Sequence, residues 1–290
     1  MPERNLLSPA AVRHNRDRTM ELDAAHLRAA ATNGNVILAT SSPDRLSGER
    51  RKNILRYAGG IFVRGEFVTH RARRLNQSPL PLPPSNTVMD NFSRVATRVA
   101  SAVSDSMPIY YRLGDYPWDD GRFWETKGHQ GLRGSGLLLA NPALLEQEFR
   151  VAERLQGTGN RLRVILPFVT SPEEQQQLTE IVRARLNPGQ IGVMVENLRH
   201  VECIDEFPTD DIQFVFPGPG DLGDELRRTT GMNDLAAEER IIALGQELAL
   251  RTAAQGIRHY LAFRCLAGQI KSDFQVVHNV YVPGELPVVA

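Results

Sequence analysis

The sequence predicts an α/β protein built as a single (β/α)₈ TIM barrel. Its 290 residues match the length of one such barrel with short extensions. Apolar, β-branched runs alternate along the chain with amphipathic stretches, which is typical of a parallel sheet wrapped by helices. Eight of these runs have the length and composition of strands, and a closed barrel of this type needs that number.

The expected strands share a run of apolar residues that ends near a glycine, a proline or a polar residue. Most are followed by a stretch long enough for a helix, which predicts parallel strands joined by helices. The expected strands are Val36–Ser42, Gly59–Gly65, Met107–Gly114, a short one near Gly131–Leu139, Arg161–Val169, Gln190–Asn197, Asp211–Gly218 and Arg258–Cys265.

Between the strands, apolar residues recur at the i, i+3, i+4 spacing of a one-faced helix. In one of these stretches Ser171-Pro172-Glu173-Glu174 supplies a capping hydroxyl, a proline and two acids, which are typical of a helix start. Asn187-Pro188-Gly189 marks its end. The expected helices are Asn86–Val103, Pro142–Leu155, Pro172–Leu186 and Ala236–Gln255.

The domain organisation follows from these elements. Residues 1–32 are expected to form an N-terminal arm and helix, and residues 33–290 one barrel domain with a C-terminal extension. Ser78–Ser85 is rich in proline and predicts a stiff loop. The tail Val276–Ala290 is rich in β-branched residues that are costly to expose together, so we expect it to pack on its own barrel or on a second subunit, as in a homodimer.

Composition and charge exclude several classes of protein. Lys and Arg number 34 and Asp and Glu also number 34, so no overall field attracts nucleic acid or an anionic membrane. No apolar run approaches the roughly 20 residues of a membrane span, and the N-terminus lacks a signal-peptide pattern. We therefore expect a cytoplasmic protein. Cys203 and Cys265 show no C-x-x-C spacing, which argues against a disulfide framework or a zinc cluster.

Charged residues gather at the expected strand ends. Three arginines (Arg64, Arg112 and Arg133) and two carboxylates (Glu196 and Asp221) lie there. In a (β/α)₈ barrel these ends surround one cavity. Each residue alone has a structural explanation as an ion pair or a helix cap, but together they predict a site. Two carboxylates suit Mg²⁺ or Mn²⁺, and guanidinium groups hold phosphate or carboxylate, so we expect a small anionic substrate.

Several motifs in the same order along the chain carry a family resemblance. Gly59–Phe67 is similar to G-I-G-L-x-R-T-E-F, Arg112–Asp115 to R-T-x-D, and Gly131–Arg133 to G-x-R. Ile191–Glu196 is close to I-G-x-M-x-E, the most specific match. From Asn33 to about Cys265 the chain resembles the C-terminal barrel of the phosphoenolpyruvate-utilising enzymes, namely pyruvate phosphate dikinase, phosphoenolpyruvate synthase and enzyme I of the sugar phosphotransferase system.

The resemblance implies roles for particular residues. Arg64 and Arg112 would bind the phosphoryl group. Glu196 and Asp221 would bind Mg²⁺. Cys265 would donate a proton to the enolate carbon.

The resemblance also implies a function. It predicts a Mg²⁺-dependent enzyme acting on phosphoenolpyruvate or a pyruvate-like 2-oxo acid through a metal-stabilised enolate. Arg133, Gly220 and Asp221 would complete the substrate-binding set. The reaction is either at the P–O bond, as in a transferase, or at a C–C bond, as in a lyase.

The sequence departs from the family pattern at three places. The family's G-T-N-D-L is Gly218–Leu222 here, so Gly220 replaces the asparagine that contacts the substrate. Gly231 stands where the family has an arginine. Cys265 is followed by Leu266-Ala267-Gly268 in place of Gly-Glu, and a buried core cysteine is an equal alternative.

Two other functions remain open at this point. Gly218–Leu222 is also similar to the G-P-x-D-L of metal-dependent pyruvate aldolases, in which backbone N–H groups of this loop hold the pyruvate carboxylate. The second alternative is a non-catalytic relative that binds phosphoenolpyruvate or a partner enzyme. The lost asparagine and arginine would then mark lost activity.

Overall fold

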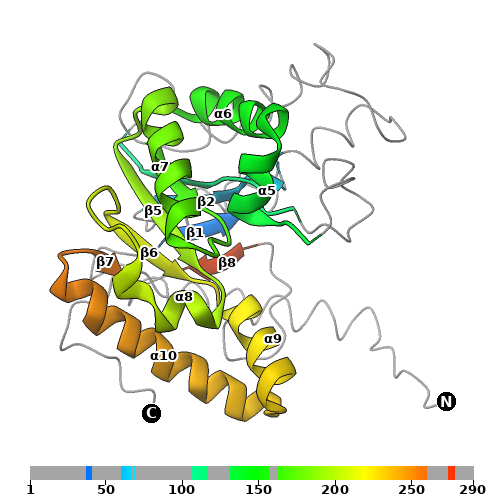
Figure 1. The fold of residues 1–290 in the computed structure, drawn as a ribbon. Coiled ribbons are helices and arrows are strands. Elements are labelled where there is room, and N and C mark those ends of the chain that lie inside the picture. Colours follow the sequence, from blue (N-terminus) through cyan, green and yellow to red (C-terminus); the bar gives the residue numbers. More distant parts are fainter. Residues whose placement is uncertain are drawn as a thin grey trace, which may run out of the picture.

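The computed structural model describes residues 37–40, 60–66, 68, 106–116, 131–156, 162–259 and 274–277. This part of the chain forms one eight-stranded sheet with the order β7-β6-β5-β4-β3-β2-β1-β8 (Figure 1). The strands are β1 Ile37–Thr40, β2 Gly60–Arg64, β3 Ile109–Arg112, β4 Leu162–Leu166, β5 Gln190–Val195, β6 Phe214–Pro217, β7 Arg258–His259 and β8 Phe274–Val277.

Strands β1 to β7 pair in parallel in the order of the sequence. This arrangement confirms the predicted α/β class and the parallel sheet. β8 differs, because it pairs antiparallel with β1 through Leu38 and Val276. In the described ranges no ladder joins β7 to β8, so the described sheet is an open arc and not a complete ring.

The predicted strand near Gly131–Leu139 is wrong. Gly134–Ala140 forms helix α5, and β3 pairs directly with β4. Gly134 has a φ of 52°, and a Cβ there would lie 2.5 Å from the Phe168 Cβ, so this position starts a tight helical turn against the β4 end. A short apolar run fits a strand or a buried helix equally well, and here the leucines pack as a helix face.

The predicted last strand and tail are described only in part. β7 covers the first two residues of Arg258–Cys265, and Cys265 lies outside the described residues. β8 includes Val276 and Val277, so the first residues of the predicted tail lie on the chain's own sheet. The predicted arm, the Ser78–Ser85 loop, the Asn86–Val103 helix and the tail beyond Val277 also lie outside the described residues.

Three of the predicted helices are confirmed with nearly the expected bounds. In α7 the Ser171 hydroxyl accepts a hydrogen bond from the Glu174 N–H at 3.2 Å, and Asn187 ends the helix in the left-handed conformation with a φ of 43°. The described helices are α5, α6 Pro142–Gln156, α7 Pro172–Leu186, α8 Leu198–Glu202, the 3₁₀ turn η3 Ile204–Glu206, α9 Pro219–Thr230 and α10 Asp234–Ala254.

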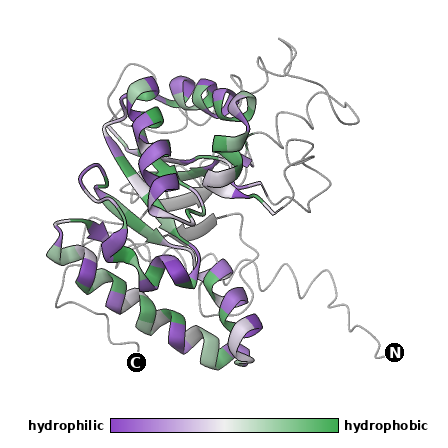
Figure 2. Ribbon diagram, viewed as in Figure 1, coloured by the Kyte–Doolittle hydropathy of each residue, from purple (hydrophilic) through white to green (hydrophobic). Residues whose placement is uncertain are grey.

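The helices cover the sheet in two groups. α6 and α7 pack together against β4, and α9 and α10 pack together, with α10 also against β7 (Figure 1). In Figure 2 the strands that are coloured are mostly hydrophobic, whereas the helices alternate hydrophobic and hydrophilic residues. No helix in the described ranges combines the length and apolar composition required of a transmembrane segment.

A second apolar cluster lies on the sheet face opposite the helices and fixes its curvature. The Phe62 and Phe216 rings are 5.6 Å apart, although three strands separate β2 from β6. In a flat sheet these strands would lie about 19 Å apart, so the sheet curls strongly, like part of a barrel wall. We call this cluster the aromatic layer; its members are Phe62, Tyr110, Ile165, Met194, Phe214 and Phe216.

The close packing of the aromatic layer generates a stability prediction. A Cβ at Gly192 would lie 2.0 Å from the Phe214 ring, so Gly192→Ala is expected to lower the free energy of unfolding by about 1–3 kcal/mol through overpacking. Urea denaturation measures the change. Gly220→Ala is the control, because a Cβ there meets no atom within 4 Å and alanine favours helix α9. Equal effects of the two substitutions would contradict this packing argument.

Candidate metal and anion site

Charged side chains follow the aromatic layer at the carboxyl ends of β2, β3 and β5. Arg64 and Arg112 are the last residues of β2 and β3 and are direct register partners. Glu196 follows the end of β5. Because side chains alternate along a strand, Arg64 and Arg112 share a sheet face with Phe62 and Tyr110. The aromatic layer therefore forms the floor of a charged site.

Arg112 is the centre of this site. Its side chain is only 4% exposed, and its guanidinium is surrounded by carboxylates. Nη1 lies 3.2 Å from the Glu196 Oε1 and 3.9 Å from the Asp115 Oδ2, while Nη2 donates to the Glu66 carboxylate. Nη1 also lies 3.4 Å from the Met194 sulfur, in the aromatic layer. Burial disfavours the charged form, but the surrounding carboxylates outweigh it and raise the Arg112 pKa.

Arg133 connects two further carboxylates. Its Nε and Nη2 donate to both oxygens of Asp115, at 3.0 and 2.5 Å. Its Nη1 donates to the Asp221 Oδ1 at 2.9 Å. The guanidinium also lies 3.9 Å from the centre of the Phe168 ring, in a cation–π contact. Desolvation opposes the charge on Arg133, yet the two aspartates raise its pKa.

Three carboxylates of the site form a possible metal-binding cluster. Asp115, Glu196 and Asp221 each offer an oxygen, and these atoms lie within 4.8 Å of one another. Asp115 and Glu196 are buried, whereas the Asp221 side chain is 35% exposed. Hard carboxylate oxygens in this number suit Mg²⁺ or Mn²⁺, with the open side left for water and substrate. We call these three residues the acidic cluster.

The carboxylates of the acidic cluster differ in proton affinity. Burial raises the pKa of Glu196 to about 7; Arg112 opposes this shift, and the neighbouring aspartates add to it. Burial acts in the same direction on Asp115, but the hydrogen bonds and charge of Arg133 outweigh it and lower the Asp115 pKa. The second Glu196 oxygen accepts the Phe168 N–H at 3.0 Å. The surroundings thus favour the ionised form of Asp115, whereas burial favours the protonated form of Glu196.

The charges of the site do not balance. Four carboxylates contact three guanidinium groups, so one negative charge is in excess when all are ionised; the pairs are Arg64–Glu66, Arg112–Glu66, Arg112–Asp115, Arg112–Glu196, Arg133–Asp115 and Arg133–Asp221. A divalent cation would reverse this sign. Binding of an anion is therefore favoured once a divalent cation is present.

The structure brings together five of the residues predicted from strand ends: Arg64, Arg112, Arg133, Glu196 and Asp221. Gly220, in the first turn of α9 beside Asp221, has open space where a side chain would lie. Cys265 lies outside the described residues.

The prediction missed two carboxylates of the site. Glu66 and Asp115 enter the sequence analysis only as parts of the motifs Gly59–Phe67 and Arg112–Asp115. Both come shortly after an arginine that ends a strand, in Arg64-Gly65-Glu66 and Arg112-Leu113-Gly114-Asp115. That spacing was the available signal, because the first residues after a parallel strand lie at the same sheet edge as its last residue.

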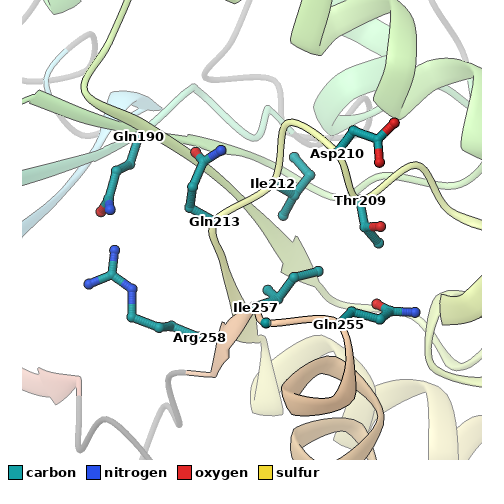
Figure 3. Close-up of a pocket in the computed structure, with 9 residues that line it drawn as sticks. Gln190, Thr209, Asp210, Ile212, Gln213, Gln255, Ile257 and Arg258 are labelled. Atoms are coloured by element: carbon teal, nitrogen blue, oxygen red, sulfur yellow. The ribbon is translucent and has the colours of Figure 1, made fainter.

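A polar hollow of about 530 Å³ lies at the opposite end of the strands (Figure 3). Gln190 begins β5, Gln213 precedes β6 and Arg258 begins β7, and all three line it. In parallel α/β sheets ligands bind outside the carboxyl ends of the strands. The acidic cluster is therefore the better candidate site.

Comparisons with known proteins give partial matches. The chain is 41% identical over 71 residues to a multiphosphoryl transfer protein of Xanthomonas campestris, a match covering 23% of this chain and 8% of that protein. It is 31% identical over 130 residues to a probable phosphoenolpyruvate synthase of Pyrococcus abyssi, covering 40% and 16%. A probable phosphoenolpyruvate synthase of Archaeoglobus fulgidus is 30% identical over 127 residues, covering 40% and 17%.

These matches span only about a sixth or less of the relatives' own length. No family model matches the chain. The similarity is thus to a part of proteins that carry phosphoenolpyruvate synthase and multiphosphoryl transfer names, which supports the resemblance seen in the motifs.

The central place of Arg112 generates a prediction about stability. Arg112→Met leaves the buried Glu66, Asp115 and Glu196 without their shared cation, so we expect it to lower the free energy of unfolding by about 3–5 kcal/mol. Arg64→Met is the matched control, because the Arg64 side chain is 32% exposed and its ion pair contributes about 1 kcal/mol or less. Guanidinium chloride denaturation compares them. Equal losses would show that Arg112 does not hold the carboxylates together.

Proposed function

We propose that this chain is a divalent-metal-dependent enzyme domain that acts on phosphoenolpyruvate or a pyruvate-like 2-oxo acid. The observation that carries the proposal is the acidic cluster of Asp115, Glu196 and Asp221, bordered by arginines at the carboxyl ends of parallel strands. The partial matches to phosphoenolpyruvate synthases support the same substrate class. We further propose that the curled sheet belongs to a complete (β/α)₈ barrel.

The acidic cluster would hold Mg²⁺ or Mn²⁺. When bound, the ion would supply positive charge that holds a substrate carboxylate and neutralises the negative charge developing on the 2-oxygen. Asp115 is ionised at neutral pH because Arg133 lowers its pKa. Glu196, with its pKa near 7, would be held in its ionised form by a bound cation.

The arginines divide into two groups. Arg112 is buried and forms ion pairs with Glu66 and Glu196. It would therefore orient these carboxylates and add positive potential to the site without contacting the substrate. Arg64 and Arg133 are partly exposed, at 32% and 27% of their side chains, so they are the cations an incoming phosphate or carboxylate reaches first. A site that excludes most water makes these charges more effective.

The neighbourhood of Gly220 favours the second candidate, a metal-dependent pyruvate aldolase. Gly220 lies in the first turn of α9 with no atom within 4 Å of its Cβ position. First-turn N–H groups have no acceptor within their helix, so they are suited to a carboxylate that approaches closely. Both candidates share the metal and the enolate of pyruvate and differ in the bond that reacts.

The decisive experiment follows exchange of the pyruvate methyl protons with D₂O by NMR, with and without Mg²⁺. Enolisation exchanges these protons without a second substrate, so metal-dependent exchange supports both enzymatic candidates. Glu196→Gln is expected to lower the exchange rate at least about 100-fold, as loss of an electrostatic stabiliser does. No exchange by the metal-loaded protein would instead favour a non-catalytic relative.

Metal binding itself gives a second prediction. Arg133 occupies oxygens of Asp115 and Asp221 that a divalent ion would share, so the guanidinium competes with the metal. In titrations followed by electron paramagnetic resonance, Arg133→Met is expected to bind Mn²⁺ about tenfold more tightly than the wild type, which corresponds to about 1.4 kcal/mol of relieved competition. Asp221→Asn is expected to bind it more weakly.

The matched control for Arg133 is Arg150→Met. It removes the same charge from an exposed ion pair with Glu146 on α6 and should leave Mn²⁺ affinity unchanged. Mn²⁺ affinity that stays the same or falls in Arg133→Met would contradict the competition.

Ligand preference separates the two reactions. If Arg64 holds a phosphate, calorimetry with Mg²⁺ present is expected to show phosphoenolpyruvate binding at least about tenfold more tightly than pyruvate, since one charged hydrogen-bonded contact contributes more than 1.4 kcal/mol. Arg64→Met should remove most of this preference, and Arg150→Met none. Equal affinities for the two compounds would favour the aldolase.

A further inference from the structure

A buried carboxylate outside the acidic cluster lies behind the site. Glu148, on α6, is 1% exposed. Its Oε2 accepts the Tyr111 hydroxyl at 2.7 Å and the Gly114 N–H at 2.9 Å, and its Oε1 accepts the Tyr116 hydroxyl. All three donors belong to residues 111–116, the end of β3 and the turn that follows it.

The same short segment carries two residues of the candidate site. Arg112 and Asp115 point to the charged site, where they meet Glu196 and Arg133. Tyr111 packs in the other core cluster, between the sheet and the helices. Glu148 therefore binds the segment from the side of the helices. Its donors, in residues 111, 114 and 116, lie before, between and after Arg112 and Asp115 in the sequence.

The segment has little regular structure to fix its shape. Strand β3 ends at Arg112, and residues 113–116 belong to no helix or strand. Their backbone N–H groups bond instead to separate partners: Leu113 to the Ile165 carbonyl at 3.0 Å, Gly114 to Glu148, and Asp115 to Glu66 at 3.3 Å. Glu148 is the partner that also binds both tyrosines.

Burying this carboxylate is costly, and the structure shows what offsets the cost. Desolvation raises the Glu148 pKa to about 7, and the hydrogen bonds from Tyr111, Tyr116 and Gly114 lower it in part. An apolar side chain at this position would leave three buried donors unpaired, which costs more than the average hydrogen bond. The carboxylate thus supplies the acceptors for the three buried donors of the segment that bears Arg112 and Asp115.

We propose that Glu148 is a positioning residue, which holds the 111–116 segment so that Asp115 and Arg112 meet Glu196 in the geometry that binds the metal. This inference rests on the proposed metal-dependent function. Glu148 acts through its three hydrogen bonds, without touching metal or substrate.

The test measures the Mn²⁺ dissociation constant, by electron paramagnetic resonance of the full chain, together with the free energy of unfolding. Glu148→Leu is expected to weaken Mn²⁺ binding about tenfold or more, the usual effect of losing a group that orients ligands. Glu148→Gln should recover most of the affinity, because the amide oxygen still accepts from Tyr111 and Gly114.

The control for general destabilisation is Thr252→Val on α10. Thr252 is buried and donates to the Leu248 carbonyl at 2.8 Å, remote in the fold from the acidic cluster. The Thr252→Val variant should be less stable than the wild type and bind Mn²⁺ with the same affinity. If Glu148→Leu fails to fold, Tyr116→Phe decides: Mn²⁺ binding at least about threefold weaker supports the inference, and wild-type affinity overturns it.

The outcomes separate this inference from the proposed function. A wild-type protein that binds no Mn²⁺ overturns both. A wild-type protein that binds Mn²⁺, with Glu148→Leu binding equally well, overturns the positioning role alone. Loss of affinity in Glu148→Leu with recovery in Glu148→Gln supports it, because a purely structural role would change the stability and not the affinity.

Discussion

The arrangement of the site depends on one buried cation, the guanidinium of Arg112. It contacts Glu66, Asp115 and Glu196, which come from three different strand ends. Three carboxylates this close and this buried would repel one another without a shared cation. The same contacts hold the ends of β2, β3 and β5 in a fixed relation. Electrostatic balance and the geometry of the sheet edge are thus set by the same side chain.

The aromatic layer makes this balance effective. Its ring centres lie 5.6–5.9 Å apart, and the Arg112 Nη1 lies 3.4 Å from the Met194 sulfur of this layer, so buried apolar side chains border the guanidinium. Charge–charge interactions are much stronger in such surroundings than at a surface. Burial and the neighbouring charged side chains together account for the opposite pKa shifts of Glu196 and Asp115. The curl of the sheet is therefore part of the chemistry of the site.

The sequence predicted much of this arrangement because strand ends carry local signals. Apolar runs followed by charged residues located β2, β3 and β5 and the residues Arg64, Arg112 and Glu196. The prediction near Gly131 was wrong because the short apolar run Leu137-Leu138-Leu139 fits either a strand or a helix. The hydrogen bonds of Glu148 could not be predicted, since they depend on Tyr111 in β3 and Tyr116 in the turn after it, and helix periodicity says nothing about such pairing. Asp115 could have been predicted, because it lies three residues after the arginine that ends β3.

The antiparallel pairing of β8 with β1 has a consequence for folding. Paired parallel strands are separated by far fewer residues of the chain than β1 and β8, because β8 follows all the other described strands in the sequence. Closing so long a loop carries a larger entropic cost. During synthesis the outer edge of β1 therefore stays without its final neighbour until Phe274–Val277 has emerged from the ribosome, and in that interval it is a place where two nascent chains can pair with each other.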